Sequence, residues 1–389
     1  EEHLEQYVKD RQQGFLRRRS ILKDLVEIEN AMILHSLNEP NGAAIFLDFA
    51  AAFPSIDQEF IFATLKEYGV PEEEINFISA LYDSSNCRLS LKGSTYDGFS
   101  LSAGVSQGCP LSQLIYALVA ELVMDKIELE LENVLIRAYA DDTVLVVKHF
   151  LKSVGPLEDL FRQFEKVSGL KLNLGKSVII PLGDYNTTEV TGQLQQQNSG
   201  WANMAVETCA KYLGFYLGPG KGQKTWDKPL AKYLARVHMW ADKAIGLHWH
   251  LRAHNAFALP TLLYVAQLET PPHSVLEAVK NSLRCTAKGP GNWCIPQDIW
   301  TLQETFGMAA SARNLLWASD AAKVRVATFD RGIKGHKQLR AECNRLRDAQ
   351  RHSDFPDRLV KMCKWFNNCF YFKLELKASW KIVFNSSLN

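Results

Sequence analysis

The sequence lacks the paired cysteines that build zinc knuckles and thioredoxin-like sites. It contains eight cysteines, but no two of them form a C-x-x-C pair. Cys343, His352, Cys363 and Cys369 lie near one another, yet their spacing is typical of no standard zinc site. We therefore predict buried thiols, which are usual for an intracellular protein.

Long apolar runs are also missing from the 389 residues. The longest, Leu114–Met124, is too short to span a bilayer and contains Glu121, and no signal peptide is visible. We therefore expect no membrane-spanning segment. Hydrophobic residues make up 47% of the chain and charged residues 22%, as in an ordinary globular protein.

There is little net charge, only +1, but the charge is unevenly distributed. Residues 1–200 hold 17 basic and 29 acidic side chains, whereas residues 201–389 hold 27 basic and 14 acidic ones. An acidic half joined to a basic half suits an enzyme that binds both metal ions and a polyanion. Two domains whose solvated faces differ in charge would give the same pattern.

The predicted elements mix strands, hairpins and helices. Strands are expected at 43–48, 134–139, 143–148, near 170–180 and at 212–217, and a hairpin over 87–101 turns at Gly93-Ser94. Helices are expected at 21–33, 57–68, 72–83, 110–131 and 154–168, and beyond Gly218–Gly222 at 226–249, 254–265, 273–286, 297–306, 309–328, 335–350 and 355–367. The amide-rich stretch 184–203 is expected to be an exposed insertion. This order favours an α+β sheet layered with helices over a doubly wound fold.

Three aspartates stand at the ends of predicted strands. Asp48 ends the apolar run 43–47, and Asp141 and Asp142 lie at the tip of the hairpin formed by 134–139 and 143–148. A buried acid needs a partner, and adjacent carboxylates repel each other unless cations lie between them. Together they predict an oxygen-rich site for two divalent metal ions. The alternative role for Asp48 is a helix or turn cap.

Six segments of the chain form a recognisable series: 13–20 (QGFLRRRS), 46–53 (FLDFAAAF), 104–112 (GVSQGCPLS), 138–142 (AYADD), 168–176 (SGLKLNLGK) and 212–214 (YLG). Together they resemble the last fingers motif and motifs A to E of the reverse transcriptases of the non-LTR (LINE-type) retrotransposon family. The resemblance covers roughly residues 12–270 and implies a right-hand polymerase palm. It implies an RNA-directed DNA polymerase that extends a primer 3′-hydroxyl with dNTPs.

The resemblance also implies a division of the chain. Residues 1–42 would be partial fingers, 43–217 the palm with the remaining fingers helices, and 218–270 a helical thumb. Residues 271–389 would be a helical C-terminal region of unknown role. A basic helix over 226–249 would contact a primer–template duplex, although an amphipathic helix with a solvated basic face fits the same sequence.

The resemblance assigns roles at the carboxylate site. Asp48 and Asp141 would hold two Mg²⁺ ions, or Mn²⁺, with the backbone carbonyl of Phe49 as a further ligand and Asp142 in a supporting position. Lys176 would act on the pyrophosphate leaving group. A solvated surface lysine fits its sequence context equally well.

Nucleotide-binding roles fall to four further residues. Phe53 would exclude a ribose 2′-hydroxyl, although it also fits as a plain core residue. Gln107 and Gly108 would line the nucleotide pocket, where glycine lets the backbone approach the sugar; an ordinary loop before a helix is the alternative. Arg19 would face the triphosphate or template. Further phosphate contacts would come from Arg11, Arg17 and Arg18, although the family usually has Pro-Gly at positions 17 and 18.

Tyr212, Leu213 and Gly214 would form the primer grip. The implied partners are an RNA template, a DNA primer and dNTPs, and another polypeptide that supplies or replaces the family's earlier fingers strands. The nucleus is the expected location, with an organelle as the alternative. A hypothesis of another class is a retrotransposon-derived polymerase-fold protein retained as a structural or RNA-binding subunit without catalysis.

Overall fold

A computed structural model describes residues 2–14, 16–17, 19–83, 85–106, 108–184, 186–243, 245–287 and 293–328. The chain divides into two compact units, Glu1–Gly222 (unit 1) and Gln223–Asn389 (unit 2). The predicted helices at 335–350 and 355–367, and the cluster Cys343, His352, Cys363 and Cys369, lie outside the described residues.

A five-stranded sheet forms the centre of unit 1. In spatial order its strands are β5 (Leu135–Tyr139), β6 (Asp142–Val147), β1 (Ala43–Leu47), β8 (Val178–Pro181) and β9 (Ala205–Val206). Neighbouring strands are antiparallel except for β8 and β9. Every residue of β1 is buried, because this central strand is covered on both faces.

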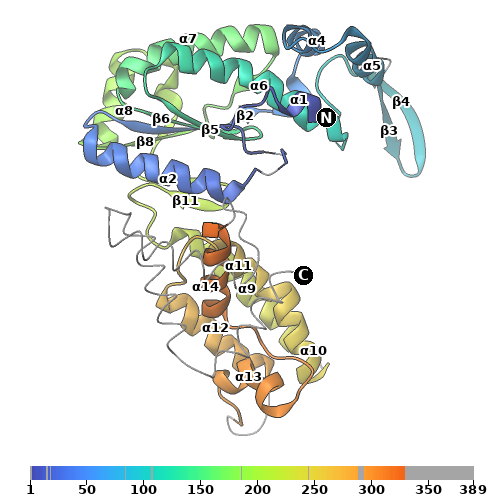
Figure 1. Cartoon of the computed structure of the whole chain (residues 1–389), viewed down its shortest axis with the longest axis vertical. Coiled ribbons are helices and arrows are strands. Elements are labelled where there is room, and N and C mark those ends of the chain that lie inside the picture. The colour runs from blue at the N-terminus through green and yellow to red at the C-terminus, as the bar shows by residue number, and fades with distance from the viewer. Residues whose placement is uncertain are drawn as a thin grey trace. The chain divides into compact units, whose positions relative to one another are not determined.

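Helices cover both faces of this sheet (Figure 1). On one face α2 (Ile21–Asn38) packs against β1, β5 and β6. On the other lie α6 (Pro110–Glu130) and α7 (Phe150–Ser168), which pack against each other. Pro110 occupies the first turn of α6, where its missing N–H costs no hydrogen bond. The predicted α+β class is confirmed.

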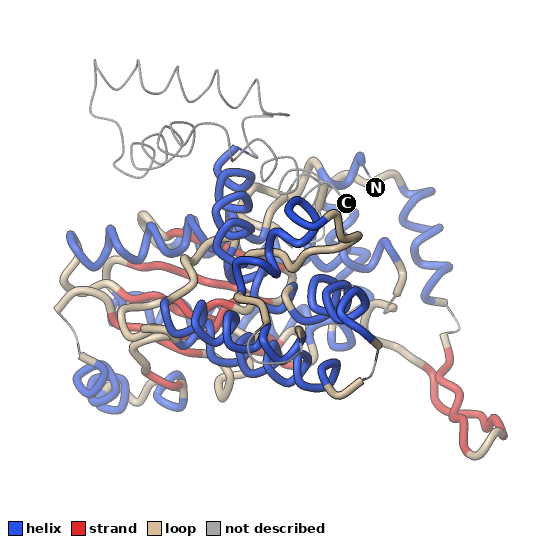
Figure 2. The backbone as a smooth tube through the Cα atoms, turned by 90° about the horizontal axis from the view of Figure 1, so that it is seen from below, coloured by secondary structure: helices blue, strands red, loops and turns tan. Residues whose placement is uncertain are grey.

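A second part of unit 1 lies beyond the sheet. Its helices are α1 (Glu2–Glu5), α3 (Ala52–Ser55), α4 (Gln58–Glu67) and α5 (Glu72–Tyr82). Next comes the two-stranded hairpin β3 (Asn86–Leu91) and β4 (Ser94–Ser100), which projects from the rest of the unit (Figures 1 and 2). Almost all of its residues are exposed, among them Leu89, Leu91, Tyr96 and Phe99.

Two regions of unit 1 differ from the sequence prediction. Residues 170–180 are not one strand, since β7 (Lys171–Leu172) and β8 are separated by a turn in which Lys176 N and Ser177 N donate to Asn173 O. The stretch 184–203 is not a plain exposed insertion. It contains α8 (Thr187–Gln196) and a 3₁₀ turn, η1 (Gly200–Asn203). Its amides face outward while Val190, Leu194 and Trp201 are buried, so helical spacing brings its few apolar residues to the core.

Unit 1 ends with the hairpin β10 (Ala210–Tyr212) and β11 (Phe215–Leu217), where one short strand was predicted. The described part of unit 2 is helical, with α9 (Lys224–Ala241), α10 (Gly246–Ala253), the π-helical η2 (His254–Ala258), α11 (Pro260–Ala266), α12 (His273–Thr286), α13 (Pro296–Phe306) and α14 (Leu315–Thr328). The predicted helix 226–249 is broken, because Gly246 takes a positive φ of 78°. No helix in the described part of the chain is both long and apolar enough to cross a membrane.

Candidate active site

Asp48 directly follows the central strand β1, and the turn after β7 fixes its backbone. The Asp48 N–H donates to Ser177 Oγ (3.2 Å), and Asp48 O accepts from Asn173 N (2.8 Å). Ser177 Oγ in turn donates to Asn173 O (2.9 Å). Both backbone groups of Asp48 are therefore held from outside its own strand, which limits how far its side chain can move.

Asp141 and Asp142 lie at the tip of the β5–β6 hairpin, as predicted: Asp141 is in the turn with Ala140, and Asp142 is the first residue of β6. The pairing of Leu47 with Thr143 in the β1–β6 ladder means that Asp48 and Asp142 continue neighbouring antiparallel strands. Tyr139 pairs with Asp142 across the hairpin. The sheet register therefore brings all three acids to the same end of the central strands.

The electrostatics of the site agree with this register. The pKa of Asp142 is raised to about 6, first by burial and then by the negative charges of Asp141 and Asp48. The pKa of Tyr116, a fully buried residue of α6, is raised well above its ordinary value by burial and then by Asp141, Asp142 and Asp48. The three carboxylates thus repel one another, and nearby cations would relieve that repulsion.

The structure places Lys176 beside Asp48. Its ammonium lies 3.8 Å from Asp48 Oδ2, and its side chain is 71% exposed, so the ion pair leaves the amine free to meet a substrate. Lys176 reaches this place because the turn at Asn173–Ser177 interrupts the predicted strand.

The three carboxylates are candidate ligands for a metal ion. In the part of the chain that the structure describes, no three His, Cys, Asp or Glu side chains gather closely enough to hold an ion by themselves. Oδ2 of Asp48 is nevertheless buried and accepts no hydrogen bond. A buried carboxylate oxygen that accepts no hydrogen bond, beside two repelling carboxylates, fits Mg²⁺, which keeps few protein ligands and completes its shell with water and phosphate.

The aromatic residues near Asp48 are held in place by packing. Phe49 pairs with Leu172 through its backbone, and its ring lies against Phe161 (6.2 Å between centroids). Phe53 stacks on Tyr116 (4.8 Å, 25°) and remains partly exposed. Tyr116, which the sequence analysis missed, therefore contacts Phe53 and lies close enough to the three acids for their charges to affect it. Only its position on the buried face of α6 could have indicated it.

The loop before α6 contains the two predicted nucleotide-pocket residues. Gly108 has φ +91°, a conformation that side chains disfavour, and a Cβ built there would meet nothing within 4 Å. The glycine is therefore explained by its backbone conformation. Gln107 lies outside the described residues.

Two arginines near the N-terminus, Arg19 and Arg11, make contacts within the protein, and their predicted phosphate contacts stay predictions. Arg19 donates to the backbone oxygens of Val8 (2.9 Å), Lys9 (2.7 Å) and Gln12 (3.0 Å), so its guanidinium organises the N-terminal segment. Arg11 is only 4% exposed and binds carboxylates of α6: Glu121 (2.5 Å), Asp125 and Glu128 (2.6 Å). Burial also raises the pKa of Glu121 to about 7, while Arg11 opposes that rise. Arg18 lies outside the described residues.

The turn Tyr212-Leu213-Gly214 joins β10 to β11, and Leu213 (φ +48°) and Gly214 (φ +90°) are both left-handed. Tyr212 Oη donates to Asp24 Oδ2 (2.7 Å) and lies 3.4 Å from Asp142 O. Its ring meets Phe46 of β1 edge-on (5.9 Å). Tyr212 therefore connects this hairpin to α2 and to the backbone of the carboxylate site.

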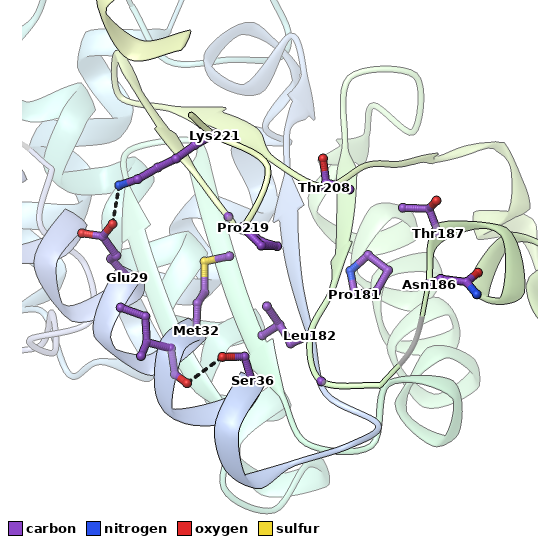
Figure 3. Close-up of a pocket in the computed structure, with 13 residues that line it drawn as sticks. Glu29, Met32, Ser36, Pro181, Leu182, Asn186, Thr187, Thr208, Pro219 and Lys221 are labelled. Atoms are coloured by element: carbon purple, nitrogen blue, oxygen red, sulfur yellow. Dashed lines mark hydrogen bonds and ion pairs between the residues drawn. The ribbon is translucent and has the colours of Figure 1, made fainter. Parts of the chain in front are cut away.

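A cavity of about 570 Å³ lies elsewhere in unit 1 (Figure 3). Its lining is largely apolar and includes Met32, Leu182 and Pro219, while the ammonium of Lys221 is paired with Glu29. None of the predicted site residues lines it, so it is separate from the carboxylate site.

Three similar proteins come from transposable elements. The Pol polyprotein of the type-2 retrotransposable element R2DM of Drosophila melanogaster is 30% identical over 173 residues, which cover 43% of this chain and 16% of that protein. The Pol polyprotein of the type-1 element R2 of Bradysia coprophila is 24% identical over 223 residues, which cover 52% of this chain and 25% of that protein. An uncharacterized 149 kDa protein of transposon TX1 of Xenopus laevis is 24% identical over 184 residues, which cover 45% of this chain and 14% of that protein. The chain thus spans a quarter or less of each relative.

Solved structures that resemble the chain include apo telomerase from Candida tropicalis and RNA-bound telomerase from Candida albicans. Both are 12% identical to it. The match to the first has a TM-score of 0.44 and covers 92% of this chain and 56% of the telomerase chain. The match to the second has a TM-score of 0.36 and covers 78% of this chain and 52% of the telomerase chain.

The predicted resemblance to reverse transcriptases is confirmed by a match to that family. Residues 1–217, more than half of the chain, match the family described as reverse transcriptase (RNA-dependent DNA polymerase). With its retrotransposon relatives and its carboxylate site between two strands, the chain belongs to the reverse transcriptase family.

Proposed function

We propose that this chain is an RNA-directed DNA polymerase that extends a primer 3′-hydroxyl with dNTPs. The observation that carries this proposal is the register of β1 and β6, which sets Asp48 beside Asp142 and its neighbour Asp141. The rise in the pKa of Asp142 caused by burial and by the other two acids supports the same convergence. Such a carboxylate cluster has no use in a purely structural protein, because unpaired buried charge is costly.

Reverse transcriptases generally use divalent metal ions. We propose that Asp48 and Asp141 would hold two Mg²⁺ ions here, with the Phe49 carbonyl as a further ligand and Asp142 in support. When bound, such ions would favour ionisation of the attacking hydroxyl and neutralise charge on the phosphate. The site residues would align the primer terminus with the α-phosphate, since catalysis of phosphoryl transfer is mainly positioning and charge stabilisation.

The neighbouring side chains suit the rest of this reaction. Lys176, close to Asp48 and largely exposed, is placed to hold or donate a proton at a leaving pyrophosphate oxygen. Phe53, whose ring is stacked on Tyr116, would clash with a 2′-hydroxyl on the incoming sugar and so favour deoxynucleotides. An RNA template and a DNA primer are the proposed macromolecular partners.

The test is primer extension on an RNA template with Mg²⁺ and dNTPs. Asp141→Asn should abolish extension, because it removes a metal-binding charge without changing side-chain volume. Asp159→Asn is the matched control, since Asp159 is exposed and pairs only with Arg162 on the surface of α7 in the described structure. Extension that persists in Asp141→Asn would refute the proposal. Tight RNA binding without extension by the native chain would instead favour a retained RNA-binding subunit.

A further inference from the structure

The segment at residues 11–13 extends the central sheet beyond its edge strand. Ala138 N donates to Arg11 O (2.8 Å), and Gln13 N donates to Ala138 O (2.7 Å), so Gln12 pairs with Ala138 in a parallel bridge. These contacts lie at the end of β5, one residue before the turn that carries Asp141. The N-terminal segment therefore reaches the back of the carboxylate site.

The side chain of Gln12 continues these contacts into the turn. It is fully buried, and its Oε1 accepts from Ala140 N (3.0 Å) and from Gly14 N (3.0 Å). Its Nε2 donates to Ala140 O (3.2 Å). A single carboxamide thus satisfies both backbone groups of Ala140, a task that needs a donor and an acceptor on the same side chain.

Ala140 is in an unusual conformation. Its φ is +58°, in the left-handed region that residues with a Cβ rarely adopt, and Asp141 follows it directly. The packing around this residue is close, because a Cβ built on Gly14 would lie 2.4 Å from Ala140 N. Hydrogen bonds from Gln12 therefore favour a turn geometry that the local sequence alone would resist.

The position of Gln12 is itself fixed from two directions. Arg19 donates to Gln12 O (3.0 Å), and Arg11 is anchored by the α6 carboxylates. Neither of these arginines needs to contact substrate for this purpose.

We propose that Gln12 is a positioning residue of the polymerase site, which holds Ala140 in its left-handed conformation and thereby directs the Asp141 carboxylate toward the metal ions. This proposal rests on the function proposed above. It predicts that loss of Gln12 affects the chemical step and metal dependence rather than nucleotide affinity.

The neighbouring Gln13 provides a matched control. Its side chain is equally buried (2% exposed), and it also bonds to backbone, to Ser20 N (3.1 Å) and Asp10 O (2.5 Å), but its amide does not contact Ala140. Gln12→Leu and Gln13→Leu therefore remove the same group from the same segment.

Two measurements on the full chain test the proposal. The first is hydrogen exchange at the Ala140 amide, which reports the Gln12 contact without any catalysis. The second is primer extension, with kcat and the dNTP KM measured over a range of Mg²⁺ concentrations. In Gln12→Leu we expect faster exchange at Ala140, a kcat lower by about 10- to 100-fold, a higher Mg²⁺ requirement and a dNTP KM within about twofold of native. Gln13→Leu should retain native exchange and kcat.

Several results would overturn the assignment. They are native exchange at Ala140 in Gln12→Leu, native kcat in Gln12→Leu while Asp141→Asn is inactive, and equal losses in the two leucine variants. If the native chain extends no primer, the polymerase function fails, whereas hydrogen exchange still decides whether Gln12 holds the turn.

Discussion

Replacing Asp24 with Asn should change how the stability of unit 1 depends on pH. Asp24 is fully buried on α2, where it accepts the hydrogen bond of Tyr212, and its Oδ1 has no hydrogen-bond partner. Burial raises its pKa from 3.8 to about 7, although the Tyr212 hydrogen bond and the charge of Arg137 oppose the rise. Asn would keep an acceptor for Tyr212 and would not titrate.

The sign follows from the two pKa values. The folded state holds the Asp24 proton more tightly than the unfolded state, so stability from this group is complete below about pH 4 and is lost as the pH rises to about 7. A pKa rise of this size corresponds to on the order of 4 kcal/mol above pH 7. Between pH 5 and pH 8, Asp24→Asn should therefore gain about 2–3 kcal/mol of unfolding free energy relative to the native chain.

Hydrogen exchange of the buried β1 amides measures this difference, because those amides exchange through unfolding of unit 1. The two chains should differ most at pH 8 and converge toward pH 4. Asp159→Asn, an exposed substitution on α7, should show no such divergence. Parallel pH profiles for Asp24→Asn and the native chain would refute the raised pKa and the reasoning from burial.

Three further predictions concern other parts of unit 1. Phe53→Ala should raise the use of ribonucleotides relative to deoxyribonucleotides by about tenfold or more in primer extension, and an unchanged ratio would contradict the steric role of the ring. Trp201→Ala should destabilise the unit by about 3–5 kcal/mol in urea unfolding, because Trp201 is buried against Phe161; a cost below 1 kcal/mol would mean that 184–203 is a dispensable insertion after all. Gly14→Ala should lower the kcat of primer extension, since its Cβ would press on the Ala140 amide. A variant with native kcat would show that the segment can shift without moving Asp141.

Much of the central sheet could be predicted from local sequence. The apolar run before Asp48 and the segment after Asp142 correspond to β1 and β6, because burial on both faces leaves a continuous apolar signature, and the segment before Asp141 corresponds to the partly buried β5. The positions of the acids at the ends of these strands predicted that they share one site. The register of β1 with β6 brings Asp48 and Asp142 to the same end of the sheet.

The remaining parts of the site depend on contacts between residues far apart in the chain. Gln12 reaches Ala140 across 128 residues, and Tyr116 is one of many buried apolar residues of α6, so its sequence gives no reason to single it out. The arginines at 11 and 19 are equally uninformative by residue type, since a guanidinium can bind phosphate, carboxylate or backbone oxygen. Only the fold shows that α6 and the N-terminal backbone occupy these two side chains.

The attachment of the N-terminal segment has a consequence for how the protein matures during synthesis. Residues 11–14 leave the ribosome before their partners, because Glu121 on α6 and Ala138 and Ala140 on the hairpin are made 110 to 128 residues later. Closing so long a loop carries an entropic cost that is recovered only when both partners are present. We therefore expect the catalytic turn to become ordered only after residues 11–14, α6 and the hairpin have all been made, so that a nascent chain stalled before residue 140 has no competent centre.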